Sequence, residues 1–235
     1  MTHQKSTSTS FSKTLHSVLV VLVLTVPFTG ASARQAASGA TEQEDSIPLF
    51  NGFSVAVDLV GPAMLMFSDY GEYEASCRLN LRNRCFPIVE VGYGKAERTD
   101  EVTEIYYKTG APYFRIGCDW NLLKNKNTGN RLFGGFRYAY TSYEVDIAKY
   151  DMTDPVWYTE TEVEVMGEKC NQHWLEAVVG IDAKIAGPLH LGWTFRWKRR
   201  VSHKDTSIGK VWYVPGYGTR GSTRLAVNFN VIIDI

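Results

Sequence analysis

The sequence has no excess of either charge, since 25 Lys and Arg residues balance 25 Asp and Glu residues in a chain of 235. Without a basic excess it lacks the electrostatic signature of a nucleic-acid-binding protein, and no nucleic-acid partner is expected. Beyond the N-terminal region, no segment has the ~18 consecutive apolar residues of a transmembrane helix. Amphipathic helical patterns longer than about ten residues are also lacking. These absences leave a chain built mainly from β-strands.

The first 33 residues have the composition of a secretory signal peptide. Lys5 and Lys13 precede the apolar run SVLVVLVLTVPF, and small residues follow it. A basic start, a short apolar core and a small-residue end are the parts of such a signal, and an anchor helix would need ~20 apolar residues. We therefore predict a signal peptide at 1–33, with cleavage at its end or as far on as Ala40, and a linker at 34–51.

Large apolar residues then recur at every second position in eight segments, the period of a β-strand with one apolar face. The segments are 52–61, 72–81, 85–94, 113–122, 131–143, 173–186, 189–198 and 222–235. Short turns follow the second, fourth and sixth segments, and long loops follow the first, third, fifth and seventh. Short turns at one end and long loops at the other are typical of outer-membrane barrels.

The two tightest turns support this pattern. If Leu81 pairs with Cys85, and Ile185 with Leu189, the apolar faces of the joined strands coincide. Pairing of the last segment with the first would remove both edges of the sheet. The predicted fold over 52–235 is therefore all-β, an eight-stranded antiparallel up-and-down transmembrane β-barrel.

The polar faces of the strands indicate which face is inside. They mix small residues with acids and bases, as a narrow eight-stranded interior requires, because buried charges are tolerated only in pairs. The predicted interior charge network is Asp58, Glu74, Arg78, Glu90, Arg115, Asp119, Arg137, Glu176, Asp182, Lys184, Arg196 and Arg224. A soluble exported barrel with its apolar face inward, binding an apolar ligand, stays open as an alternative.

Aromatic residues on the apolar faces fall near the strand ends. In membrane barrels such residues form girdles at the two interfaces. The predicted girdle is Tyr73, Tyr93, Trp120, Tyr140 and Trp197. Ordinary strand-forming aromatics of a soluble core are the alternative interpretation.

Residues that carry chemistry are sparse. His173, His190 and His203 have no second His or Cys at metal-ligand spacing, and no phosphate-binding or nucleophile motif occurs. We predict no catalytic, cofactor-binding or metal site, and no cofactor. A lipid-modifying barrel enzyme, with a Ser, a His and an acid at one rim, is the alternative, and it would centre on His173.

The four cysteines do not form an obvious framework. Export would permit disulfides, but Cys77 is expected opposite Val89 rather than Cys85. We interpret Cys77, Cys85 and Cys118 as small apolar strand residues, and the sequence supports no claim about disulfides. The state of Cys170, in a long loop, stays open.

Together these features resemble the class of eight-stranded outer-membrane β-barrels that includes the OmpA membrane domain and OmpX, and a Gram-negative barrel family of unknown function. The resemblance covers Gly52–Ile235. It implies outer-membrane lipids and the barrel-assembly machinery as partners, with the last strand recognised during assembly. In this class that strand typically ends on an aromatic residue, whereas Ile235 stands here. The assembly strand is represented by Phe229, Val231, Ile233 and Ile235.

The expected function follows from this class. We predict an outer-membrane barrel with a plugged, salt-bridged interior, and a structural, adhesive or partner-binding role through long extracellular loops. The third loop contains WYTETEVEVMG, whose alternation predicts a hairpin that extends two strands and is a possible contact site for an extracellular partner.

Overall fold

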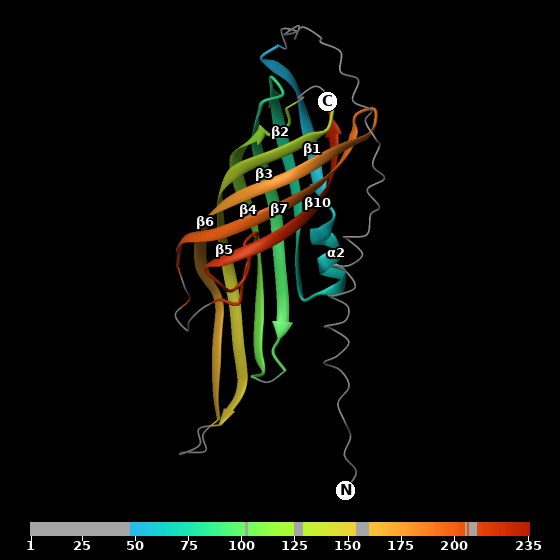
Figure 1. Ribbon diagram of the computed structural model, residues 1–235. Coiled ribbons are helices and arrows are strands. Elements are labelled where there is room, and N and C mark those ends of the chain that lie inside the picture. The colour runs from blue at the N-terminus through green and yellow to red at the C-terminus, as the bar shows by residue number, and fades with distance from the viewer. Residues whose placement is uncertain (1–47, 102, 125–128, 154–159, 205, 207–210) are drawn as a thin grey trace, which may run out of the picture. The chain divides into compact units, whose positions relative to one another are not determined.

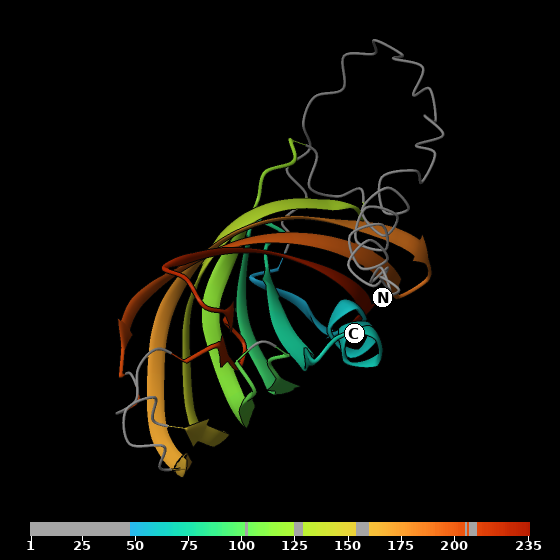
Figure 2. The same cartoon turned by 90° about the horizontal axis from the view of Figure 1, so that it is seen from below.

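The computed structural model describes residues 48–235 except 102, 125–128, 154–159, 205 and 207–210. The predicted signal peptide at 1–33, and the linker at 34–51 up to residue 47, lie outside the described residues. Eight long strands form a closed antiparallel barrel in the order β1-β10-β7-β6-β5-β4-β3-β2 (Figures 1 and 2). The predicted eight-stranded up-and-down barrel is confirmed. Its strands are β1 (Phe50–Asp58), β2 (Tyr70–Leu81), β3 (Cys85–Thr99), β4 (Ile105–Asn121), β5 (Arg131–Thr153), β6 (Glu160–Ala186), β7 (Leu189–His203) and β10 (Thr223–Asp234).

The barrel closes where β10 meets β1. The register runs from Ser54 opposite Asp234 to Asp58 opposite Asn230. Next to the Ser54–Asp234 pair, the amide of Ile235 donates to the carbonyl of Phe53 at 2.8 Å, and the amide of Phe53 donates to the carbonyl of Ile235 at 3.0 Å. Closure satisfies the backbone donors and acceptors that an open sheet would leave at its edges.

The tight turns differ in how well the sequence predicts them. Leu81 lies opposite Cys85 as expected. The predicted pairing of Ile185 with Leu189 is wrong at its last step, because a register shift places Ala186 opposite Leu189. Gly187 adopts a φ of +52°, which closes a two-residue turn that a left-handed residue permits. Pairing in the strand bodies keeps the expected parity.

At the long-loop end the strands extend further than expected. β3 and β4 pair as far as Thr99 opposite Tyr106, and β5 pairs with β6 as far as Thr153 opposite Glu160. The hairpin predicted from the alternating loop sequence is thus present in the backbone. In Figure 1, β5 and β6 (yellow to orange) reach beyond the other strands.

The connection after β1 contains a helix that the sequence analysis missed, α2 (Val60–Phe67). It carries no charge and leaves Met66 and Phe67 79% and 75% exposed. Its apolar run is too short to show a helical period, which explains the miss. In the described part of the chain, no helix is long and apolar enough to cross a membrane.

Two shorter strands lie between β7 and β10. They are β8 (Tyr213–Val214) and β9 (Gly218–Thr219), paired as a small hairpin. Figure 2 looks along the barrel and shows this red hairpin within the ring of strands. The barrel interior is therefore filled by a loop segment as well as by strand side chains.

Candidate functional site

The outer wall of the barrel is apolar. Every long strand presents exposed large apolar side chains, and two examples are Phe136 at 66% and Ile116 at 61% exposure. Exposed apolar patches on soluble monomers rarely exceed a few hundred Å², whereas this wall carries such residues on all eight strands. The structure thus places the apolar faces outward, and the alternative of a soluble barrel with its apolar face inward is wrong on this point.

The five residues expected to form an aromatic girdle all lie on the outer wall. Their side chains are between 36% and 57% exposed. Tyr73 and Tyr93 are register partners on β2 and β3. Trp120 lies near the short-turn end and packs edge-on against Phe136 at a centroid distance of 6.5 Å.

Glu90 on β3 is the centre of the buried charge cluster. Its carboxylate accepts from Arg196 on β7 at 2.6 Å, from Arg137 on β5 at 3.1 Å and from Arg115 on β4 at 3.2 Å. Glu90 and all three arginines are at most 3% exposed. A carboxylate shared by three guanidinium groups requires further acids nearby, because unpaired buried charge is strongly unfavourable.

Those acids come from neighbouring strands. Glu74 on β2 accepts from Arg196 at 2.7 Å and also from Arg115. Glu176 on β6 lies 3.0 Å from the Nε of Arg115 and 3.2 Å from Arg196. The cluster therefore joins side chains of β2, β3, β4, β5, β6 and β7 across the barrel.

A second group continues the network toward the short turns. Arg137 donates to both oxygens of Asp119, at 2.6 and 2.9 Å. Arg78 on β2 lies 2.6 Å from Asp182 and 3.4 Å from Asp119. This paired geometry is the strong, charge-assisted form of hydrogen bonding.

Glycines on the inner face make room for these long side chains. A Cβ added at Gly135 would overlap the carboxylate of Asp119. One added at Gly117 would lie 2.8 Å from the Cδ of Arg137. The mixture of small and charged residues seen in the sequence is therefore a packing requirement of the narrow interior.

Three members of the predicted network lie elsewhere. Lys184 is exposed at the short-turn mouth, where its long side chain reaches water. Arg224 is half-buried and donates to the backbone carbonyls of Thr219 and Arg220 rather than to a carboxylate. Asp58 is buried but accepts from the backbone amides of Gly61 and Phe229, at 2.7 and 3.1 Å.

The sequence analysis missed a buried cation, Lys198 on β7. It is 3% exposed, and its Nζ donates to the carbonyl of Gly216 at 2.7 Å. Lys198 has the same inward parity as Arg196, so the two-residue period could have identified it. Its partner is a loop carbonyl, which no strand pattern could indicate.

That carbonyl belongs to the β8–β9 hairpin, which occupies the long-loop end of the interior. Arg115 also donates to Gly216, at 2.8 Å, and Tyr107 donates to the carbonyl of Tyr213 at 2.6 Å. Burial raises the pKa of Tyr107, so this hydroxyl keeps its proton. The surrounding core consists of Ala96, Tyr107, Ala111, Tyr113, Ala139, Tyr143, Val145, Cys170, Trp174, Val211, Tyr213, Val214 and Tyr217.

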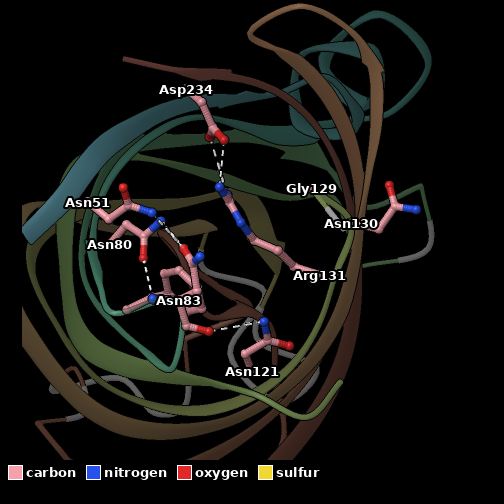
Figure 3. Close-up of a pocket in the computed structure, with 9 residues that line it drawn as sticks. Asn51, Asn80, Asn83, Asn121, Gly129, Asn130, Arg131 and Asp234 are labelled. Carbon is pink, nitrogen blue, oxygen red and sulfur yellow. Dashed lines mark hydrogen bonds and ion pairs between the residues drawn. The ribbon is translucent and has the colours of Figure 1, made fainter. Parts of the chain in front are cut away.

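The short-turn mouth is lined by amides (Figure 3). A cavity of about 210 Å³ lies here, and the amides of Asn51 and Asn80 both donate to the side-chain oxygen of Asn83, at 3.0 and 2.7 Å. Arg131 reaches across to Asp234, with its Nη2 2.5 Å from the carboxylate. This mouth is therefore narrowed by side chains that bind one another.

The rim histidine is held by a tyrosine. The hydroxyl of Tyr138 and the Nδ1 of His173 are 2.6 Å apart, and the ring of Tyr140 packs on the same imidazole at 4.7 Å. Ser202 is the register partner of His173 on β7. A serine thus lies on the neighbouring strand, although the imidazole is oriented by Tyr138 rather than by an acid.

Beyond Tyr93, toward the long-loop ends, the outer wall becomes charged. The hydroxyl of Tyr106 donates to Glu97 at 3.0 Å, and Lys108 lies 3.8 Å from the same carboxylate. The hydrogen bond from Tyr106, with the charge of Lys108, lowers the pKa of Glu97. On β3 this polar zone begins at Lys95, two residues past Tyr93, where the apolar wall ends.

A family model described as Domain of unknown function (DUF6048) matches residues 11–234. The chain belongs to this family. No curated protein matches it in sequence. Among solved structures, it is similar to a major outer membrane protein from Thermus thermophilus, with a TM-score of 0.43 and 12% identity, covering 78% of this chain and 98% of that one.

Proposed function

We propose that this protein is an outer-membrane β-barrel with a plugged interior, which is exported by the signal peptide predicted at 1–33. The observation that carries the proposal is the inverted distribution of side chains: exposed apolar residues cover the wall, and paired charges fill the interior. In water such a wall would favour aggregation. In a bilayer it is the outward apolar band that membrane barrels require.

Two further features support a membrane setting. The aromatic residues Tyr73, Tyr93, Tyr140 and Trp197 lie toward the long-loop ends, as girdle residues do at an interface. The uncharged helix α2 leaves Met66 and Phe67 exposed. An interfacial position would bury these side chains at the boundary between headgroups and acyl chains.

Three obstacles along the axis support a plugged interior. The β8–β9 hairpin fills the long-loop end, and the cluster around Glu90 joins six strands in the middle. Arg131 and Asp234 span the short-turn mouth. Because each obstacle is held by direct hydrogen bonds or ion pairs, we expect no steady ion conduction through the barrel.

The long β5–β6 hairpin supports a contact role outside the membrane. β6 has 27 residues, whereas a tilted strand crosses a bilayer with about 9–11. More than half of β6 therefore lies beyond the apolar wall. We propose that this extension presents the surface for structural, adhesive or partner-binding contacts.

Cell fractionation with gel electrophoresis tests the proposal. We expect the protein in the outer-membrane fraction, and we expect unheated samples to migrate differently from heated ones because a closed barrel resists detergent. Purified protein in a planar bilayer should give no steady channels. Recovery in a soluble fraction would contradict the membrane assignment, and steady channels would contradict the plug.

A further inference from the structure

Two cysteines meet on the outer wall near the short-turn end. Cys85 is the first residue of β3, and Cys118 is on β4, 33 residues later in the chain. The register places Cys85 opposite Trp120 and Pro87 opposite Cys118. The two cysteines are therefore diagonal neighbours on the same face of adjacent strands.

Their sulfur atoms are 2.7 Å apart. Ordinary non-bonded contacts between carbon atoms lie at about 3.5–4.0 Å, and sulfur is the larger atom. A disulfide bond is about 2.05 Å long. The remaining gap is well under 1 Å, so bond formation needs only small side-chain rotations.

We propose that Cys85 and Cys118 form a disulfide in the mature protein, which ties β3 to β4 beside the short-turn mouth. The oxidising setting rests on the proposed function, since export places the thiols where disulfides persist. Residues at diagonal positions on two paired strands are usually farther apart than residues directly opposite each other. Here the two sulfur atoms are nevertheless close enough to bond.

The oxidant required is a second disulfide, supplied by an oxidised thiol–disulfide exchange protein. The thiolate of one cysteine attacks that disulfide and forms a mixed disulfide, and the second thiolate then displaces the oxidant. The Cys85–Cys118 bond forms, two electrons pass to the oxidant, and it leaves as a dithiol with the two protons. Both side chains are half-buried, so an exchange partner can reach them most easily before the barrel inserts.

The bond would fix the two strands close to the amides that narrow the mouth. The backbone amide of Asn121 donates to the carbonyl of Arg84 at 2.9 Å, and the side chain of Asn121 donates to the carbonyl of Asn83 at 3.1 Å. These bonds flank the cysteine pair in sequence. A covalent link here would keep the β2–β3 turn against the end of β4.

The other two cysteines provide matched controls. Cys77 is on β2 and lies opposite Val89, and Cys170 is buried in the core near the long loops. Trypsin separates all four cysteines, because Arg84 precedes Cys85 and Arg115 lies between Cys85 and Cys118. A bond between Cys85 and Cys118 is therefore recognised as peptide 85–95 joined to peptide 116–124.

The test is mass spectrometry of the full chain from cells, denatured in the presence of N-ethylmaleimide. We expect two alkylated cysteines without reduction, four after reduction, and a joined peptide about 2 Da lighter than the two free peptides together. Cys85→Ser should leave three alkylated cysteines, whereas Cys77→Ser should keep the joined peptide. Four alkylated cysteines in unreduced protein from the outer membrane would overturn the disulfide and leave the proposed function intact.

A second arm separates the pair's geometry from its compartment. Folded protein is reduced, freed of reductant and incubated with oxidised glutathione. Formation of the joined peptide supports the pairing, and its absence overturns the inference wherever the protein is located. Recovery of the chain in the cytoplasm would instead contradict the proposed function, and the same incubation would still decide whether the two sulfurs can bond.

Discussion

The middle of the barrel interior and its long-loop end are filled in different ways. In the middle, strands supply both partners of every ion pair, and Glu90 accepts hydrogen bonds from Arg115, Arg137 and Arg196. At the long-loop end, the strands supply aromatic rings and the β8–β9 hairpin supplies what they pack against. The ion pairs of the charged region therefore need only the barrel strands, whereas the aromatic region also needs the β8–β9 hairpin, which is not part of the wall.

The difference shows what each filling requires. Paired charges need fixed positions on several strands, because an unpartnered guanidinium in a low-dielectric interior is strongly unfavourable. Aromatic packing tolerates a movable partner, since its energy comes from contact area. The long-loop end is therefore the region where the plug could be removed without destroying the barrel.

The largest effect should come from opening the barrel wall, because both regions of the interior depend on a closed barrel. Deleting Val231–Ile235 removes the backbone pairing of β10 with residues 53–57 of β1 and leaves only Asp58 opposite Asn230. We expect loss of assembly, measured as absence of the heat-modifiable band in the outer membrane. Ile233→Val is the control and should assemble. Normal assembly of the deletion would show that closure does not depend on this pairing.

The next largest effect should come from the centre of the charged region. Glu90→Gln leaves three buried arginines with one fewer negative charge, and we expect it to lower the free energy of unfolding by about 3–5 kcal/mol. Urea unfolding in detergent or lipid measures this change. Glu144→Gln is the control, because its pair with Lys169 is exposed and 3.9 Å long; it should change stability by less than about 1 kcal/mol. Equal effects in the two variants would refute the central role of Glu90.

These two regions also differ in how far the sequence could predict them. Glu74, Glu90 and Arg196 were identifiable because inward positions recur at every second residue of a strand. Their pairing was not, since Arg196 meets Glu74 and Glu90 across the interior at sequence separations of 122 and 106. Parity gives the face of a residue, and the curvature of the closed sheet decides which partners it meets.

The remaining misses have local causes. Lys184 has inward parity, but it lies at the mouth, where water competes for its charge. Gly216 lies in a glycine-rich loop whose sequence carries no period, so its insertion beside Tyr113 could not be foreseen. The closeness of Cys85 and Cys118 depends on local strand geometry at a diagonal position, which register alone does not fix.

A smaller effect should follow from changing the aromatic region. Gly216 has a φ of +77°, and a Cβ there would overlap the ring of Tyr113. Gly216→Ala should displace the hairpin and destabilise the protein by about 1–3 kcal/mol. Limited proteolysis of the β8–β9 segment in folded protein should show faster cleavage than in wild type.

Gly218→Ala is the matched control for this change. Gly218 also has a positive φ, +108°, but no atom lies within 4 Å of the added Cβ. Gly218→Ala should lower the stability by the backbone strain of about 1 kcal/mol, and the hairpin should stay in the interior. Similar cleavage rates in the two variants would mean that backbone strain, rather than the clash with Tyr113, controls the plug.

The smallest effect concerns the charged zone beyond the girdle. The hydrogen bond from Tyr106 lowers the pKa of Glu97 in the folded state. The ionised Glu97 therefore stabilises the folded state above the pKa that it has in the unfolded chain, and this stabilisation is lost as the pH falls through the folded pKa. In Tyr106→Phe the pKa of Glu97 should rise toward 4.5. NMR titration of the Glu97 carboxyl carbon measures it, with Tyr73→Phe as the control. If the pKa of Glu97 were unchanged in Tyr106→Phe, the hydrogen bond from Tyr106 would not be the cause of the lowered pKa.

The orientation of the two faces is the central claim, and spin labels along β5 in a lipid bilayer test it most directly. A spin-labelled cysteine replaces Phe136, Tyr138, Tyr140, Ala139 or Thr141, one at a time, in a protein in which the four natural cysteines have been changed to serine. The first three side chains are exposed on the wall and the last two are fully buried. We predict high accessibility to dissolved oxygen at 136, 138 and 140 and low accessibility at 139 and 141. High oxygen accessibility at 139 and 141 with low accessibility at 136, 138 and 140, or no alternation at all, would contradict a barrel with an apolar wall in lipid and a filled polar interior.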